Sequence, residues 1–334
     1  MKNWLPVLAF FLLTALVAGP VAADPCLIFV HGKQTDTGTY TSYNKARNYW
    51  YYDGWFSDTD FLKTATKNWA LDHYVVGYNG TRPYYESQSA GEVANEIVNA
   101  VNGGNDAGGN NCQGSTSYIV IAHSMGNTIM DFILGNNDPS DPNYNYSGPF
   151  DQVASSISYV LSVSGAHRGS EGADAACNDN NFLCDFIAGF IQGCDDATYW
   201  LRSDDAVQVR NYASAPARNV YLTGGYEAIF GASACLSGED DGVVQHASQY
   251  ACSGSATAGY NNDNVCGNGA KQESSGFFNL DTGHENHDDI RNDSDRDTRR
   301  AIPDGIWTCS GSPCSPGSSV ASSKSTAQLV KMFY

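Results

Sequence analysis

The stretch YIVIAHSMGNTIMDFILG, residues 118–135, decides the predicted fold. Residues 117–122 form a short, mostly apolar run, which is typical of a strand buried on both faces of a parallel sheet. Residues 127–134 continue with apolar side chains at helical spacing. Between them, Ala-His-Ser-Met-Gly over 122–126 differs from Gly-x-Ser-x-Gly only at its first small residue. Small residues let a strand and a helix approach closely, so the stretch predicts a strand, a sharp turn that exposes Ser124, and a helix.

Similar patterns extend along the chain on both sides of this stretch. Apolar runs that predict further strands cover residues 26–30, 74–78, 157–163 and 219–223. Apolar residues over 92–101 recur at helical spacing and predict a crossover helix. Strands that alternate with helices imply an α/β fold, a mostly parallel central sheet flanked by helices. Such sheets hold their sites outside the carboxyl ends of the strands, where His31-Gly32, Ser124 and the loop 164–170 are expected to meet.

The first residues have the pattern of an export signal. Lys2 precedes an apolar stretch over about residues 5–17, and Val21-Ala-Ala23 has the small side chains of a cleavage site. We therefore expect a signal peptide over 1–23 and a secreted protein, with no stable membrane span, because the apolar stretch is short. Ten cysteines agree with export, since an oxidising compartment favours disulfides. They allow up to five pairs, and the sequence leaves the pairing open.

The formal net charge of −18 narrows the range of partners. Nucleic acid phosphates would be repelled, so we expect no nucleic acid partner, and anionic membrane surfaces are disfavoured for the same reason. Residues 24–334 are expected to form one domain and to act as a monomer. Within it, residues from about 171 to 215 interrupt the alternation of strands and helices and carry three cysteines. This insertion is predicted to be a disulfide-tied cap, with one apolar helix face over 182–191 that serves either to pack onto the body or to act as a lid.

Three further motifs accompany the Ser124 turn. They are Phe29-Val-His-Gly32, Ala166-His-Arg-Gly-Ser-Glu-Gly-Ala-Asp174 and Asp240-Asp-Gly-Val-Val244. With these motifs the chain resembles secreted bacterial lipases of the α/β-hydrolase superfamily, both the Burkholderia and Pseudomonas true lipases and the Bacillus lipases that carry Ala-His-Ser-Met-Gly. It is similar in part to extracellular poly(hydroxyalkanoate) depolymerases with a lipase box. The resemblance implies an α/β-hydrolase fold for residues 24–334, and catalysis of carboxylic-ester hydrolysis.

Ester hydrolysis by a serine sets requirements for the groups around Ser124. A serine hydroxyl needs an imidazole to take its proton, and the imidazole needs a carboxylate to fix its tautomer. In this fold the chain order is serine, acid, histidine. Asp241 is the expected acid, because Asp-Gly-Val-Val resembles the acid-bearing loop of the lipases. Asp240 and Glu239 are the adjacent alternatives.

Two histidines compete for the role of the base. Asn286-His287, with an aspartate two residues later, resembles the Asn-His-x-Asp of the Burkholderia-type enzymes. Gly283-His284 instead resembles the Gly-His of the small Bacillus lipases and of the depolymerases. We favour His287 and keep His284 as the alternative base. Another histidine, His167, is expected to shape its own loop rather than to act in catalysis.

The oxyanion formed during catalysis needs backbone N–H donors. We expect one from Met125, directly after the serine, and one from Lys33, directly after His31-Gly32. The chemistry requires no cofactor. The true lipases that the chain resembles usually hold a structural Ca²⁺ near the histidine loop, and Asp289 stands where one ligand would lie.

The sequence thus predicts a secreted serine carboxylic-ester hydrolase, a lipase or esterase that forms an acyl-enzyme on Ser124. Its expected partner is an ester substrate. One alternative is an extracellular depolymerase of poly(3-hydroxybutyrate) or a similar polyester. A second, from a different class, is a catalytically inactive α/β-hydrolase that serves as a binding protein. Neither the acyl chain length nor a preference for polymers follows from the sequence.

Overall fold

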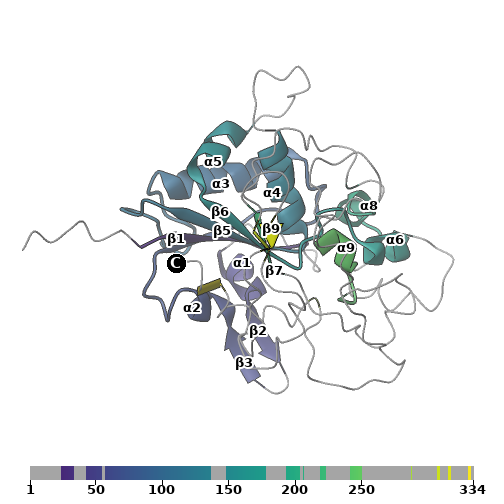
Figure 1. Cartoon of the computed structure of the whole chain (residues 1–334), viewed down its shortest axis with the longest axis horizontal. Helices are drawn as coiled ribbons and strands as arrows, with labels where there is room; N and C mark the ends of the chain where they lie inside the picture. Colours follow the sequence, from purple (N-terminus) through teal and green to yellow (C-terminus); the bar gives the residue numbers. More distant parts are fainter. Residues whose placement is uncertain are drawn as a thin grey trace, which may run out of the picture.

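The computed structural model gives an α/β fold built around one seven-stranded sheet (Figure 1). The structure describes residues 24–33, 43–54, 57–136, 148–177, 193–203, 206, 219–222, 241–249, 287, 307–308, 315–316 and 330–331. The strands of the large sheet are β1 (Cys26–Val30), β4 (His73–Val76), β5 (Tyr118–His123), β6 (Tyr159–Val163), β7 (Asn219–Leu222), β8 (Trp307–Thr308) and β9 (Ser315–Pro316). A separate antiparallel pair is formed by β2 (Tyr51–Gly54) and β3 (Ser57–Asp60).

The strand order is β4-β1-β5-β6-β7-β8-β9, and the first five strands run parallel. β1 lies between β4 and β5, with Val30 paired to Val76 on one side and to Ala122 on the other. Every residue of β1 is buried, which is why this strand has a continuous apolar sequence. The predicted mostly parallel sheet is confirmed. The short antiparallel strands β8 and β9, which extend its edge, were not predicted.

Helices cover both faces of the sheet, as Figure 1 shows. On one face lie α3 (Glu92–Val101), α4 (Met125–Gly135) and α5 (Phe150–Ser156), and the π-helix η1 (Ser87–Gly91) precedes α3. On the other lie α1 (Tyr43–Tyr49) and α2 (Phe61–Ala65), together with the β2–β3 pair. Alternate residues of β1 serve the two faces: Ile28 and Val30 pack in the cluster that contains α3 and α4, whereas Leu27 and Phe29 pack in the cluster that contains α1 and α2.

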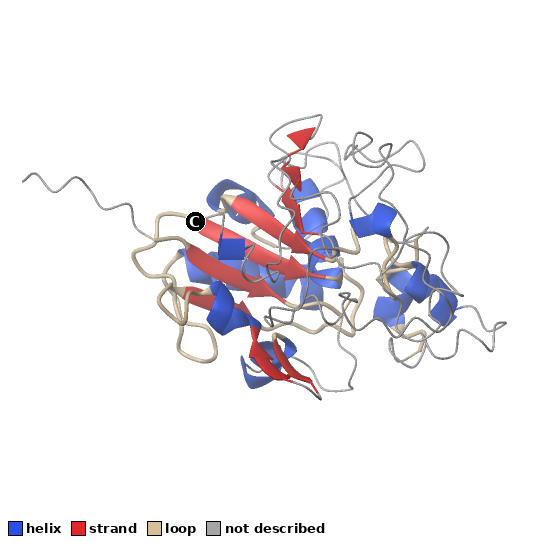
Figure 2. Cartoon of the chain, turned by 60° about the horizontal axis from the view of Figure 1, so that its bottom comes forward, coloured by secondary structure: helices blue, strands red, loops and turns tan. Residues whose placement is uncertain are grey.

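Three short helices lie together beyond the carboxyl ends of the strands (Figure 2). They are α6 (Glu171–Cys177), α8 (Asp196–Trp200) and α9 (His246–Gln249). α6 and α8 belong to the predicted cap, and the disulfide Cys177–Cys194 joins its two described parts. The segment 178–192, with the apolar positions of the expected helix face, lies outside the described residues.

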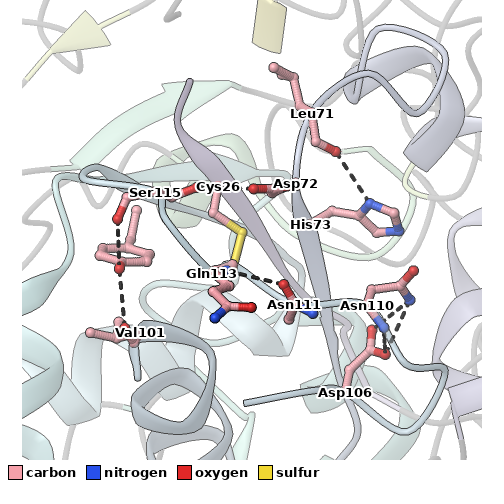
Figure 3. The surroundings of a disulfide bond; sticks show 12 residues. Cys26, Leu71, Asp72, His73, Val101, Asp106, Asn110, Asn111, Gln113 and Ser115 are labelled. Atoms are coloured by element: carbon pink, nitrogen blue, oxygen red, sulfur yellow. Dashed lines mark hydrogen bonds between the residues drawn. A yellow bond between two sulfur atoms is a disulfide. The ribbon is translucent and has the colours of Figure 1, made fainter. Parts of the chain in front are cut away.

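A second disulfide, Cys26–Cys112, closes a much longer loop. It ties the first residue of β1 to the segment that leads into β5, and Figure 3 shows it beside Asn111 and Gln113. Asp106 orders the preceding turn, because its carboxylate accepts hydrogen bonds from the backbone and side-chain amides of Asn110. The disulfide therefore ties β1 to the segment that precedes β5, and these two strands bring Gly32 and Ser124 together.

The remaining cysteines lie outside the described residues. In the part of the chain that the structure describes, no helix is both long enough and apolar enough to cross a membrane. Val330 is fully buried in the cluster that contains Leu27 and Phe29.

Candidate active site

Ser124 stands at the turn between β5 and α4. Its backbone has φ 52° and ψ −126°, a left-handed conformation that is strained for a residue with a side chain. The turn requires small neighbours, because a Cβ at Gly126 would come within 2.6 Å of the His31 carbonyl oxygen. A Cβ at Gly32 would likewise come within 2.7 Å of Ser124 Cβ. The predicted strand, sharp turn and helix are thus present, and the His31-Gly32 loop packs directly against the turn.

The side chains of Ser124, His287 and Asp241 form one hydrogen-bonded chain. The distance from His287 Nε2 to Ser124 Oγ is 2.9 Å, and that from His287 Nδ1 to Asp241 Oδ2 is 2.8 Å. Asp241 is fully buried, while His287 and Ser124 are 6% and 8% exposed. The contacts join parts of the chain that lie 163 and 46 residues apart in the sequence. The structure therefore brings together the serine, the acid and the favoured histidine of the sequence prediction.

The surroundings of Asp241 fix the tautomer of His287. Asp241 Oδ1 accepts the backbone N–H groups of Val243 and Val244 at 3.1 and 2.7 Å, and this leaves Oδ2 for the imidazole. A carboxylate oxygen can only accept, so His287 Nδ1 carries the proton and donates it. The lone pair of Nε2 then faces the Ser124 hydroxyl. A backbone hydrogen bond from His287 N to Asp241 O, at 3.0 Å, holds the two residues in register.

His123, the residue before the serine, holds the other side of His287. Its Nε2 lies 3.0 Å from the His287 carbonyl oxygen, and its Nδ1 lies 2.5 Å from the Tyr49 hydroxyl. The carbonyl only accepts, so Nε2 donates, and in a neutral ring Nδ1 accepts the Tyr49 proton. Tyr49 could not be predicted from the sequence, because its contact with His123 spans 74 residues and no local pattern reveals it.

Of the two residues expected to supply oxyanion donors, Met125 follows Ser124 directly, and Lys33 follows Gly32, which packs against Ser124. Met125 is the first residue of α4, where backbone N–H groups have no partner within the helix. Lys33 follows Gly32, and its side chain is nearly buried. The Lys33 ammonium donates to Asp195 Oδ2 at 3.0 Å, and Asp195 caps α8 by accepting the backbone N–H of Thr198. An ion pair therefore connects the predicted cap region, which contains Asp195, to Lys33, one of the two expected oxyanion donors.

A second serine, histidine and aspartate form a hydrogen-bonded set nearby. His167 lies 2.6 Å from Ser162 Oγ and 2.7 Å from Asp131 Oδ2, and all three residues are buried. Ser162 lies within β6 rather than on a turn, and the backbone of Gly165 covers it, since a Cβ there would meet its hydroxyl at 2.5 Å. This buried set braces the 164–170 loop, the role expected of His167. The loop in turn holds the serine turn, because Ala166 N donates to the Ser124 carbonyl at 3.2 Å.

Two sequence predictions fall on parts of the chain that are not described. His284, the alternative base, and Asp289, the expected calcium ligand, both lie outside the described residues. Among the residues that are described, no group of three or more histidine, cysteine, aspartate or glutamate side chains could hold a metal ion.

No protein-family model and no curated protein sequence matches the chain. Solved structures to which it is similar include bacterial lipases and esterases. The mature Bacillus licheniformis lipase BlEst2 shares 18% identity over 83% of this chain and 90% of that chain, with a TM-score of 0.49. The Staphylococcus hyicus lipase shares 15% identity over 70% of this chain and 82% of that chain, with a TM-score of 0.43. EstA from Clostridium botulinum shares 15% identity over 70% and 76%, also with a TM-score of 0.43.

The fold itself follows from the topology described above. Five parallel strands in the order β4-β1-β5-β6-β7 have helices on both faces. The middle strand of the five, β5, ends in the sharp turn that presents a serine at the start of a helix. The chain has an α/β-hydrolase fold.

Proposed function

We propose that the protein is a secreted serine carboxylic-ester hydrolase, a lipase or esterase. The observation that carries the proposal is the hydrogen-bonded chain from Ser124 through His287 to the buried Asp241. Ser124 stands on a strained turn at the carboxyl end of a central parallel strand, where α/β enzymes bind their substrates. The predicted export signal supports action outside the cell.

In the proposed reaction His287 Nε2 takes the Ser124 proton as the serine oxygen attacks the ester carbonyl. The resulting oxyanion is stabilised by the backbone N–H groups of Met125 and Lys33. The imidazolium, stabilised by Asp241, then gives its proton to the leaving alcohol, and an acyl-enzyme ester remains on the serine. Water attacks this ester with His287 again as base, which releases the acid and restores the serine hydroxyl.

The test is hydrolysis of p-nitrophenyl esters by the mature chain and by Ser124→Ala. Ser162→Ala is a matched control. It also removes a buried serine hydroxyl that is hydrogen-bonded to a histidine, His167, but this serine does not lie on the turn. We expect Ser124→Ala to lose at least about 10⁴-fold in kcat and the control to retain activity of the same order as the wild type. Activity retained by folded Ser124→Ala would refute the mechanism.

A second pair of variants decides the base. His287→Ala should reduce kcat by several orders of magnitude, whereas His284→Ala should not, because His287 is the imidazole bonded to Ser124 Oγ. The reverse result would assign the base to His284. A panel of short esters, long-chain triglycerides and polyhydroxybutyrate then distinguishes an esterase, a lipase and a polyester depolymerase.

A further inference from the structure

Tyr78 lies two residues after β4 and is fully buried beneath the loop that contains His31 and Gly32. Its hydroxyl donates to the His31 carbonyl oxygen at 2.7 Å and, more weakly, to the Gly32 carbonyl oxygen at 3.1 Å. Its ring stacks on the His31 imidazole, with ring centroids 3.9 Å apart and planes 9° from parallel. The loop that precedes Lys33 is thus held from below by one aromatic residue.

His31 contributes a second hydrogen bond to the same loop. Its Nδ1 donates to the Gly32 carbonyl oxygen at 2.8 Å. A carbonyl oxygen has two lone pairs, so the His31 and Tyr78 donors can both be accommodated on Gly32. The Gly32 carbonyl is therefore directed toward His31 and Tyr78.

The direction of this carbonyl determines the direction of the next N–H. A trans peptide is planar, and its N–H points opposite to its C=O. The Lys33 N–H must therefore point away from Tyr78. On its other side the loop packs against the serine turn, where a Cβ at Gly32 would meet Ser124 Cβ at 2.7 Å. An N–H turned away from Tyr78 thus points to the side on which an oxyanion would form at Ser124.

The Tyr78 hydroxyl keeps its proton in the folded protein and therefore remains a hydrogen-bond donor. Burial raises the pKa of this phenol well above its ordinary value, so it stays protonated in the folded protein. An ionised phenolate could only accept and would repel both carbonyl oxygens.

We infer that Tyr78 is a positioning residue for ester hydrolysis, which holds the Gly32–Lys33 peptide so that the Lys33 N–H faces the oxyanion. The inference rests on the proposed function. Tyr78 acts through the backbone of the loop rather than on the reacting atoms. Its loss should therefore weaken binding of the transition state and leave the acid–base groups unchanged.

The test compares Tyr78→Phe with Tyr74→Phe, a matched control. Tyr74 is also buried, but its hydroxyl bonds Glu96 and Asn99, away from the loop. For Tyr78→Phe we expect kcat for a p-nitrophenyl ester to fall about 10-fold with little change in KM. The affinity for phenylboronic acid, which forms a tetrahedral adduct with a catalytic serine, should fall by a similar factor. The pH dependence of kcat/KM should keep the wild-type midpoint.

Equal kinetics for the two variants would overturn the inference, and so would a shifted pH midpoint in Tyr78→Phe. Should Tyr78→Phe not fold, His31→Phe keeps an aromatic ring in the stack and removes the other donor to Gly32. His31→Phe should lose both kcat and boronate affinity, as expected for Tyr78→Phe. A His31→Phe variant that keeps both would equally overturn the inference. Failure of the proposed function is a separate result: wild-type protein that hydrolyses no ester, or active Ser124→Ala.

Discussion

Replacing Asp241 with asparagine exchanges one carboxylate oxygen for an amide nitrogen and leaves the shape unchanged. In the most favourable orientation the amide oxygen keeps the backbone N–H groups of Val243 and Val244, now bonded to Oδ1 at 3.1 and 2.7 Å. The amide nitrogen then faces His287 Nδ1, which lies 2.8 Å from Oδ2 in the wild type. Because an amide nitrogen donates, Nδ1 must accept and the ring proton moves to Nε2. In that tautomer His287 cannot take the Ser124 proton.

The structure also sets the size of the effect. To restore the productive tautomer, the introduced amide must flip and leave two buried N–H donors without an acceptor. Each unsatisfied donor costs up to about 2–3 kcal/mol, so the flip costs roughly 4–6 kcal/mol. That free energy corresponds to a loss of about 10³–10⁴ in kcat. It agrees with the order of 10⁴ expected when a triad histidine is held in the wrong tautomer.

The assay is kcat for a p-nitrophenyl ester, normalised to the folded fraction measured by circular dichroism. Asp131→Asn is the matched control, since Asp131 is also buried and bonded to a histidine, His167, at 2.7 Å. This control should lower thermal stability but keep kcat of the folded protein within about 10-fold, because His167 contacts Ser162 rather than Ser124. If Asp241→Asn keeps kcat within about 10-fold of wild type, or if both variants lose equally, the tautomer argument is wrong.

Three further predictions concern residues that stabilise the fold around the site. Gly126→Ala should lower the unfolding free energy by about 1–3 kcal/mol and should also lower kcat, because its Cβ would meet the carbonyl oxygens of residues 30 and 31 at 2.8 and 2.6 Å. Thermal melts and ester kinetics measure the two effects. Wild-type values for both would contradict the prediction. Loss of the Cys26–Cys112 disulfide, whose ends are 86 residues apart, should lower the unfolding free energy by about 4–5 kcal/mol. Denaturant unfolding of Cys26→Ala/Cys112→Ala measures this, and a loss below about 1 kcal/mol would speak against it. Burial and the Glu96 hydrogen bond raise the pKa of Tyr74 above its ordinary value of 10.0, so above pH 10 the unfolded chain loses this proton while the folded chain keeps it. Stability should therefore fall with rising pH by about 1.4 kcal/mol per unit for this group, and unfolding of Tyr74→Phe at about pH 9–11 should show a shallower fall than wild type.

Local patterns account for the parts of the fold that were predicted. Residues 26–30 were expected as a buried strand and are β1 with the same bounds. Residues 92–101 were expected as a helix and are α3. Both predictions succeed because burial on two faces requires an uninterrupted apolar run and burial on one helix face requires a 3.6-residue period. The edge strands β8 and β9 carry two residues each, too few for any periodic signal.

For the site, too, local patterns predicted some residues, whereas contacts between distant parts of the chain decided others. Ser124 could be singled out from residues 117–134, because the small residues around it lie between a predicted buried strand and a predicted helix, where a sharp turn requires small neighbours. Local motifs favoured His287 but kept His284 as an alternative, since the two histidines stand three residues apart and each lies in a motif of known lipases. Which imidazole reaches Ser124 depends on a contact that spans 163 residues. The structure places the His287 imidazole beside Ser124. Its role as base is a prediction that His287→Ala and His284→Ala test.

The sequence by itself determined the order of the five parallel strands, the helices α3 and α4 and the turn at Ser124, and it singled out the acidic loop at Asp241, because each depends on side chains within a few residues of one another. Only the tertiary structure decided which groups support them. Tyr49 behind His123, Tyr78 beneath the His31-Gly32 loop and Asp195 on Lys33 all act across 46 to 162 residues of sequence. Such hydrogen bonds form only after the sheet has brought the carboxyl ends of its parallel strands together, and no local pattern records them.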